Sequence, residues 1–206
     1  MADGGIQRGL FGRAESPYDP KYSTTAYASG SSNGCGTSTA CSFASFGFAG
    51  ETVTSGRSSA SNNGLVGYSP SRSVTPARGQ WPLYPTCDVI VPNTRSVEDM
   101  LAVLNIIVAE DDADRGSDYW RNQKHVAIPN VSEVRPADYL SLKETSALYG
   151  KRIAVPRFQA LWDVARRDLE AAGATVVETD FPPLEQYTKQ DFPGQNYNVL
   201  GMLSSC

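Results

Sequence analysis

The sequence is poor in the residues that several common kinds of site require. It has a single histidine, His125, and its four cysteines form no CxxC pair. The cysteines are Cys35, Cys41, Cys87 and Cys206. We therefore expect neither a metal site nor a disulfide framework. The sequence also has no apolar run long enough to cross a membrane and no apolar signal segment near its start. These absences favour a reducing compartment, which by default is the cytoplasm.

An excess of positive charge is also missing. The chain has 206 residues, with 18 Lys and Arg against 22 Asp and Glu, which gives a net charge of −4. This balance argues against binding to nucleic acid or to an anionic membrane surface. The length is enough for a substantial hydrophobic core.

The segment Ala28–Ser71 is made almost entirely of Gly, Ser, Thr, Asn and Ala, with few charges. Such composition is typical of a flexible linker. Three phenylalanines and two cysteines interrupt it, however, and a linker has no use for them. We predict that Thr37–Ala49 forms a buried helix that runs into a short strand. This unit would hold two serine-containing loops, Gly30–Gly34 and Gly50–Arg57, side by side.

These loops resemble the amidase signature family of serine hydrolases. The family's first loop reads roughly Gly-Gly-Ser-Ser-Gly-Gly, and its second Gly-Thr-Asp-x-Gly-Gly-Ser-Ile-Arg. The matching segments here are Ser29–Gly34 and Ala49–Arg57, followed by Gly64–Ser71 and by a weaker match over Asp88–Asp99. The sequence around Ser55–Arg57 is most similar to that of a fungal branch of the family.

The resemblance implies a Ser–cis-Ser–Lys mechanism that cleaves a carboxylic amide, or an ester, through an acyl-serine. It assigns Ser55 as the nucleophile and Ser31 as the cis-serine that relays the proton. Backbone N–H groups of Thr52, Val53, Thr54 and Ser55 would form the oxyanion hole, with Ser32 and Arg57 in support. It implies no cofactor and no metal.

The sequence departs from the family pattern at several of these positions. Glu51 stands where the family has Asp, and Tyr68-Ser69 replaces Leu-Lys. Thr54 replaces a Gly, which predicts a distorted turn because Thr does not reach positive φ cheaply. The family's catalytic lysine lies well before the first serine loop, where this sequence has only Lys21. Family members are also longer at both ends, so the resemblance implies an incomplete domain.

Elsewhere the pattern predicts a mixed α/β fold. We expect strands at Leu65–Tyr68 and Asp88–Val91, and a helix over Ser96–Asp111 that begins with Ser96 as its N-cap. Lys151–Pro182 reads as a strand–helix–strand unit with Gly173 at the helix end, which implies parallel strands. The predicted architecture is therefore an α/β fold of amidase-signature type, with a mixed sheet flanked by helices. Its parts would be an extended segment over residues 1–28 and a partial domain over 29–206.

Several alternatives stay open. Lys21 could replace the missing base, and His125 could serve a classical Ser-His-Asp mechanism, but neither has a supporting motif around it. Arg78–Trp81 could line a substrate pocket or simply pack over a loop. As a whole, the chain could be an amidase-like serine hydrolase, a catalytically inactive relative that lacks the lysine, or a non-enzymatic binding module.

Overall fold

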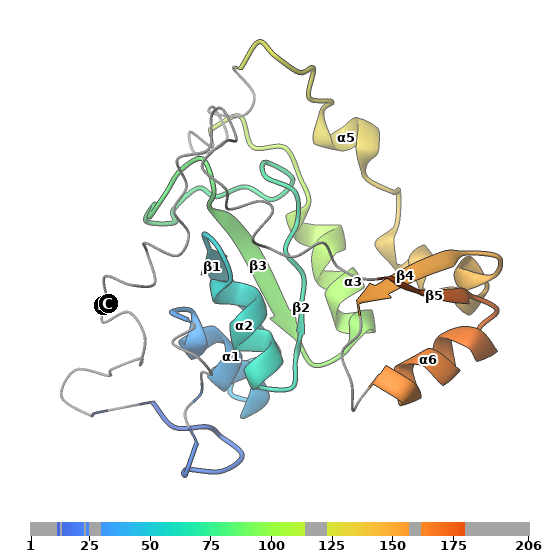
Figure 1. Ribbon diagram of the computed structural model, residues 1–206. Coiled ribbons are helices and arrows are strands. Elements are labelled where there is room, and N and C mark those ends of the chain that lie inside the picture. Colours follow the sequence, from blue (N-terminus) through green and yellow to red (C-terminus); the bar gives the residue numbers. More distant parts are fainter. Residues whose placement is uncertain are drawn as a thin grey trace, which may run out of the picture. The chain divides into compact units, whose positions relative to one another are not determined.

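Strand β3 (Val89–Thr94) is the central strand of a three-stranded antiparallel sheet (Figure 1). The computed structural model describes residues 12, 14–22, 24, 30–113, 123–156 and 162–179. Strand β1 (Phe46–Glu51) pairs with one edge of β3, and the short strand β2 (Val66–Gly67) pairs with the other. The run Val89–Val91 is β-branched throughout, which suits a central strand. The two strands predicted from the sequence in this region are thus present, with shifted ends.

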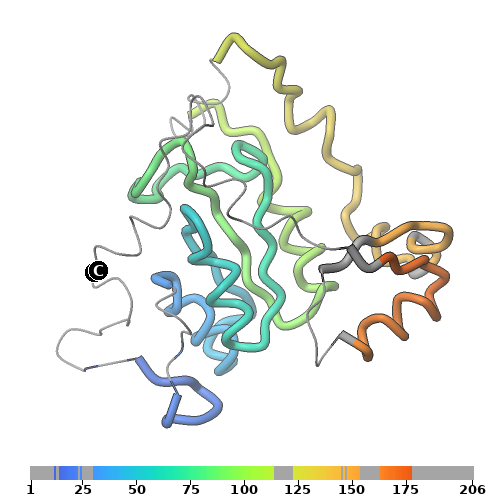
Figure 2. Tube along the Cα trace, in the orientation of Figure 1, coloured from blue at the N-terminus to red at the C-terminus, as the bar shows by residue number. Residues whose placement is uncertain are grey.

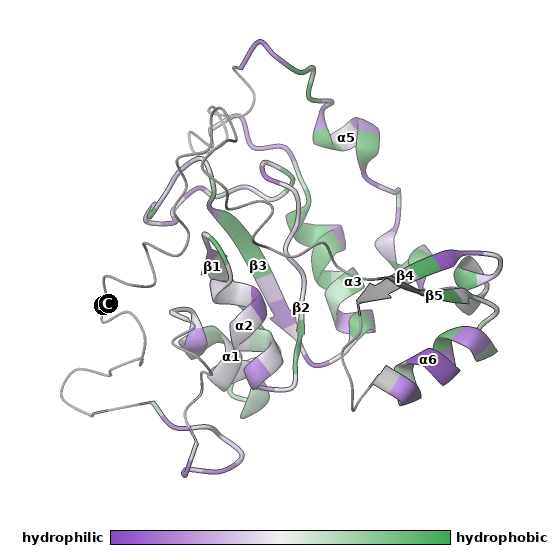
Figure 3. Ribbon diagram, viewed as in Figure 1, coloured by the Kyte–Doolittle hydropathy of each residue, from purple (hydrophilic) through white to green (hydrophobic). Residues whose placement is uncertain are grey.

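Two short helices pack against this sheet. Helix α1 (Asn33–Ala40) contacts β1, and helix α2 (Ser55–Asn62) contacts β1, β3 and α1. The tube in Figure 2 follows the chain from α1 through β1 into α2, and these three consecutive elements lie side by side. Figure 3 shows helix α3 (Val97–Ile107) largely apolar and β3 apolar in its first half, whereas α1 and α2 are largely pale or polar. Hydrophobic side chains are therefore not what brings α1 and α2 together.

Glycine lets these helices approach their neighbours closely. A Cβ placed on Gly36 of α1 would lie 2.3 Å from Ser59 Oγ of α2, and one on Gly56 would lie 2.5 Å from Val91 Cβ. Both distances are far inside van der Waals contact. The small residues of Ala28–Ser71 thus allow tight packing of one element on another, which is why this segment is a folded unit and not a linker.

The prediction of a buried helix and strand over Thr37–Ala49 is right in its elements and wrong in its burial. Phe43, Phe46 and Phe48 are 83%, 40% and 49% exposed. Side chains alternate along a strand, so the small residues of β1 face the helices while Phe46 and Phe48 share the other face. The two rings meet edge to face, with centroids 5.3 Å apart.

Helix α3 (Val97–Ile107) begins as predicted, since the Ser96 hydroxyl accepts a hydrogen bond from the Asp99 N–H at 3.1 Å. It ends before the predicted Asp111. Its buried residues are Met100, Leu101, Val103 and Leu104. Val97 and Ile106 are 60% and 77% exposed, so they lie outside the buried face of the helix.

A hydrophobic cluster lies on one side of α3. Met100, Leu104 and Val108 pack with Val131, which opens the short helix α5 (Val131–Val134). Two 3-10 turns follow, η2 (Tyr139–Lys143) and η3 (Thr145–Leu148).

The chain divides into two compact units, Met1–Ser141 and Leu142–Cys206. The second unit contains the predicted strand–helix–strand: β4 (Arg152–Pro156), α6 (Trp162–Ala171) and β5 (Thr175–Thr179). The two strands are parallel, which confirms the prediction. Gly173 follows α6 with φ +84°, a conformation that favours glycine, and the next N–H, that of Ala174, bonds back to Leu169 O.

The segment before the first serine loop is anchored to α2. It turns back on itself through a hydrogen bond from Ser16 N to Tyr22 O, and Tyr18 donates its hydroxyl to Asn63 O at 2.8 Å. The predicted boundary between residues 28 and 29 lies outside the described residues, so the division into two parts stays a prediction. Among the described residues, no helix has the length and hydropathy of a membrane span.

Candidate active site

Ser55, the predicted nucleophile, is the first residue of α2 and is half-buried. Its position depends on Glu51, the last residue of β1, whose side chain is buried with 3% exposure. The Glu51 carboxylate accepts the backbone N–H groups of Gly56 at 3.1 Å and Arg57 at 2.9 Å. The first N–H groups of a helix have no partner within the helix, and a negative charge there also suits the helix dipole. Glu51 therefore fixes the end of the strand and the start of the helix to each other.

Arg57 completes a clamp around the turn between them. Its Nε lies 2.8 Å from Glu51 Oε1, and its Nη2 donates to the carbonyl of Val53 at 2.6 Å. The Arg57 side chain is 55% exposed, so its charge stays partly solvated. The contact with Val53 O holds the turn Thr52–Thr54 at its middle residue.

The turn leaves backbone N–H groups unused. Val53 and Thr54 donate no N–H to another described residue, and both residues are exposed. Because Glu51 takes the N–H groups of Gly56 and Arg57, the donors that stay open are those next to Ser55. Thr54 has φ −140°, which any residue can adopt, so the Thr side chain causes no backbone strain at this position.

Ser31 and Ser32 lie just before α1, and the Gly30–Ser31 peptide bond is cis. The Ser32 hydroxyl donates to Gly50 O at 2.6 Å, near the end of β1. The Ser32 carbonyl accepts a hydrogen bond from Ser59 Oγ at 3.1 Å, and Ser59 is one helical turn after Ser55. The structure thus ties the first serine loop to the elements on both sides of the second, as the sequence predicted.

The hydroxyls of Ser31 and Ser55 themselves are not joined. Within the described residues, neither makes a hydrogen bond to the other or to a third group. Catalytic hydrogen bonds are often long without substrate and shorten when it binds. The structure therefore connects the residues that flank the two serines.

Asp88 also belongs to this site, a role that the sequence analysis missed. Its Oδ1 accepts the Thr52 hydroxyl at 2.6 Å, and its Oδ2 accepts the N–H groups of Leu83 and Tyr84 at 2.8 and 2.9 Å. One carboxylate therefore holds the turn before Ser55 and a loop that precedes β3. The available signal was the place of Asp88 directly before a strand that pairs with β1.

The two alternative bases gain no support from the described contacts. Lys21 is exposed, and its backbone N–H donates to Asp19 Oδ1. His125 is exposed, and its backbone N–H donates to Gln123 Oε1. In the parts of the chain that the structure describes, neither side chain bonds to a serine hydroxyl.

A family model described as Amidase matches residues 4–195. The chain belongs to the amidase family. It is 33% identical to a probable amidase of Arabidopsis thaliana over 86% of the chain and 32% of that protein. It is 32% identical to a putative amidase of Arthroderma benhamiae over 80% of the chain and 28% of that protein.

Solved structures agree with this family. The native peptide amidase of Stenotrophomonas maltophilia aligns with a TM-score of 0.71 and 29% identity, over 90% of this chain and 36% of that one. The α/β fold of amidase-signature type is thereby confirmed. The chain spans about a third of the length of the relatives that it matches.

Proposed function

We propose that this chain carries the nucleophile segment of an amidase, in which Ser55 attacks the carbonyl carbon of an amide. The observation that supports this most is the capping of α2 by Glu51. It occupies the N–H groups of Gly56 and Arg57, whereas those of Val53, Thr54 and Ser55 donate to no other described residue. Donors arranged in this way before reaction are what stabilise a developing oxyanion.

In the proposed reaction Ser55 Oγ bonds to the carbonyl carbon while Ser31 accepts its proton and passes its own hydroxyl proton on to a base, which later returns a proton to the leaving amine. The resulting oxyanion accepts hydrogen bonds from the turn Thr52–Ser55. The C–N bond then breaks, the amine leaves with a proton, and water hydrolyses the acyl-serine. A lysine would act as base in such a triad, and we assign that role to none of the lysines in this sequence. Ser32 and Arg57 support the site by holding Gly50 and Val53.

Labelling with a fluorophosphonate tests this proposal, because such a probe reacts with activated serines. We expect wild-type protein to be labelled, Ser55→Ala not to be labelled, and Ser61→Ala, an exposed serine of the same helix, to be labelled like wild type. Ser31→Ala should slow labelling strongly. Far-UV circular dichroism and a cooperative melt come first, to establish that each variant is folded.

The second candidate is an amidase relative without catalytic activity. One observation favours it: the hydroxyls of Ser31 and Ser55 share no hydrogen bond within the described residues. Folded protein that resists labelling would support this candidate. A non-enzymatic binding module would also resist labelling, and would bind an amide equally well after Ser55→Ala.

The substrate that we propose is a small-molecule carboxylic amide, or an ester. The net charge of −4 supports a partner other than nucleic acid. We further propose a cytoplasmic location and no cofactor or metal. The Arabidopsis and Arthroderma relatives are almost equally similar to the chain, so the fungal branch indicated by Ser55–Arg57 stays a prediction.

A further inference from the structure

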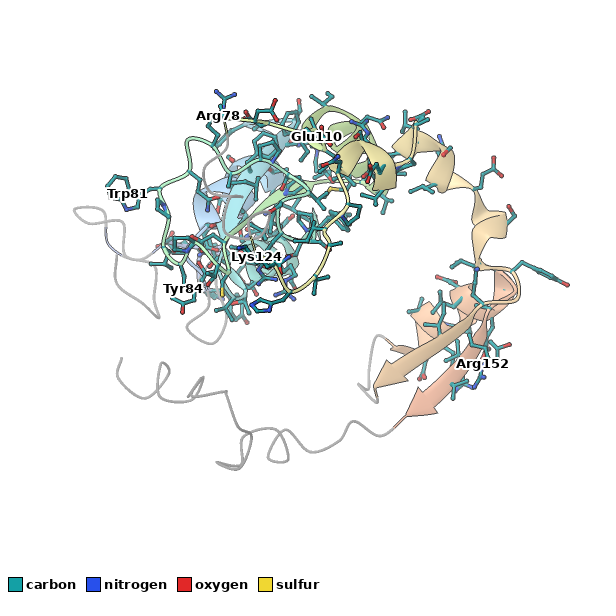
Figure 4. The ribbon with its side chains drawn as sticks, turned by 90° about the horizontal axis from the view of Figure 1, so that it is seen from above. Arg78, Trp81, Tyr84, Glu110, Lys124 and Arg152 are labelled. Atoms are coloured by element: carbon teal, nitrogen blue, oxygen red, sulfur yellow. The ribbon has the colours of Figure 1, made fainter. Side chains whose placement is uncertain are left out.

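The loop between β2 and β3 presents apolar side chains to solvent. Trp81 is 92% exposed, Leu83 79% and Tyr84 43%. Figure 4 shows the Trp81 ring standing clear of the ribbon around it. Of the two predictions for Trp81, packing over a loop is therefore wrong. An exposed tryptophan, leucine and tyrosine within four positions form an unusual apolar surface.

This loop is held in a defined shape. Gln80 N–H bonds to Ala77 O at 3.0 Å, and the N–H groups of Cys87 and Asp88 bond to Tyr84 O at 2.8 and 3.0 Å. The Asp88 carboxylate adds the two bonds to Leu83 and Tyr84 described above. The apolar side chains are thus carried on an ordered backbone, which lowers the entropy that binding a ligand would cost.

The loop is also connected to the second serine loop. Asp88 joins it to Thr52, at the start of the turn that precedes Ser55. The Gln80 side chain lies against Gly50, where its Nε2 is 2.7 Å from the position of an added Cβ. Gly50 in turn accepts the Ser32 hydroxyl. A ligand held by the loop would therefore lie next to residues that fix Ser55 and Ser32.

We propose that Trp81–Tyr84 is the substrate-recognition loop of the site, and that it receives an aromatic or long aliphatic group of the amide. This inference rests on the proposed function of the serine loops. The exposed side chains of the loop, Trp81, Leu83 and Tyr84, carry no charge. They therefore favour an apolar group of the ligand over an ionic one. Asp88 is a positioning residue, which transmits the placement of the loop to the turn Thr52–Ser55.

The first test measures binding to Ser55→Ala, so that it does not depend on activity. Phenylacetamide should bind about tenfold more tightly than acetamide, as expected when an aromatic ring is buried against apolar side chains. Trp81→Ala should abolish this preference. Tyr149→Ala, which removes another exposed aromatic side chain (81%), should keep it. Equal affinity for the two amides, or a preference that survives Trp81→Ala, would overturn the proposal.

The second test follows the backbone N–H signals of Val53 and Thr54 by NMR during the same titration. They should shift with phenylacetamide while Asp88 is present and stay unchanged in Asp88→Asn. Thr52→Val removes only the hydroxyl that donates to Asp88. The two N–H signals should therefore stay unchanged in this variant too, as in Asp88→Asn. Equal shifts in all three proteins would refute the role of Asp88. If fluorophosphonate labelling fails while the binding preference is found, the proposed hydrolysis fails and the recognition loop stands.

Discussion

The carboxylate of Glu51 and the guanidinium of Arg57 meet 2.8 Å apart at the junction of β1 and α2. Glu51 is buried and accepts two backbone N–H groups in addition to this ion pair. Residues six positions apart thus hold the strand end, the turn and the helix start together. Any change in the Glu51 side chain should therefore alter the strand end, the turn and the helix start together.

We therefore expect Glu51→Ala to lower the free energy of unfolding by about 1–3 kcal/mol, because the two N–H groups lose a charged acceptor. Glu51→Asp, which keeps the carboxylate on a shorter side chain, should lose less. Urea unfolding followed by circular dichroism measures both. Glu144→Ala, at an exposed position, serves as control and should change little. A Glu51→Ala protein as stable as wild type would contradict the clamp.

The contact between α1 and α2 predicts opposite effects at two glycines of the same helix. Gly36→Ala would place a methyl group 2.3 Å from Ser59 Oγ and 3.0 Å from Ser59 O, and should destabilise the protein by about 1–3 kcal/mol. Gly34→Ala has nothing within 4 Å, and should stabilise it by about 0.4–1 kcal/mol through the unfolded chain. Thermal melts of the two variants measure the difference. If both variants shift in the same direction, the close packing of the helices is not what we describe.

Burial raises the pKa of the Cys35 thiol to about 11. Only about one thiol in a thousand is then ionised at pH 8, so alkylation of Cys35 by iodoacetamide should be slow and should accelerate about tenfold per pH unit up to pH 11. Peptide mapping by mass spectrometry separates Cys35 from the other cysteines. Fast alkylation of Cys35 in folded protein at pH 8 would show that this thiol is not buried.

The same shift affects stability. The folded protein holds the Cys35 proton more strongly than the unfolded chain, so this stabilisation is complete below pH 9.0. It should decline as the pH rises from 9.0 to about 11. Cys35→Ser is expected to show less of this decline, which unfolding at several pH values would measure.

Ser96 caps α3, and its replacement gives a further test. Ser96→Ala removes the acceptor of the Asp99 N–H and should cost about 1 kcal/mol. Ser96→Asp keeps an acceptor at the same position and should restore most of the loss. Ser45→Ala, at an exposed position between α1 and β1, is the control. Denaturant titration distinguishes these outcomes.

Local signals predicted much of the fold correctly. Ser96 begins its helix and Gly173 follows another because cap residues act through neighbours in the chain. The exposure of Phe46 and Phe48 could not be predicted in the same way. Alternation along a strand defines its two faces, but which face is covered depends on elements elsewhere, and here small residues provide the contact.

At the site, too, features that depend on neighbouring residues were predicted, whereas contacts between residues far apart in the chain were not. The serine loops were visible in the sequence, and their predicted connection appears as the bond between Ser59 and Ser32. The roles of Ser31 and Ser55 in catalysis stay predictions. Glu51 counted only as a departure from the family pattern, although its side chain reaches three donors. The bond between Thr52 and Asp88 joins residues far apart in the chain, which no spacing rule reveals.

The glycines at the contacts of α1 and α2 set how this protein can change. Every replacement of a glycine adds at least one carbon, and at Gly36 and Gly56 that carbon meets an atom of the adjacent element. Even the methyl group of alanine is too large at these two positions. Polar and apolar side chains are therefore excluded alike. Steric contact between adjacent elements, more than hydrophobicity, therefore limits which substitutions the framework around Ser55 can accept.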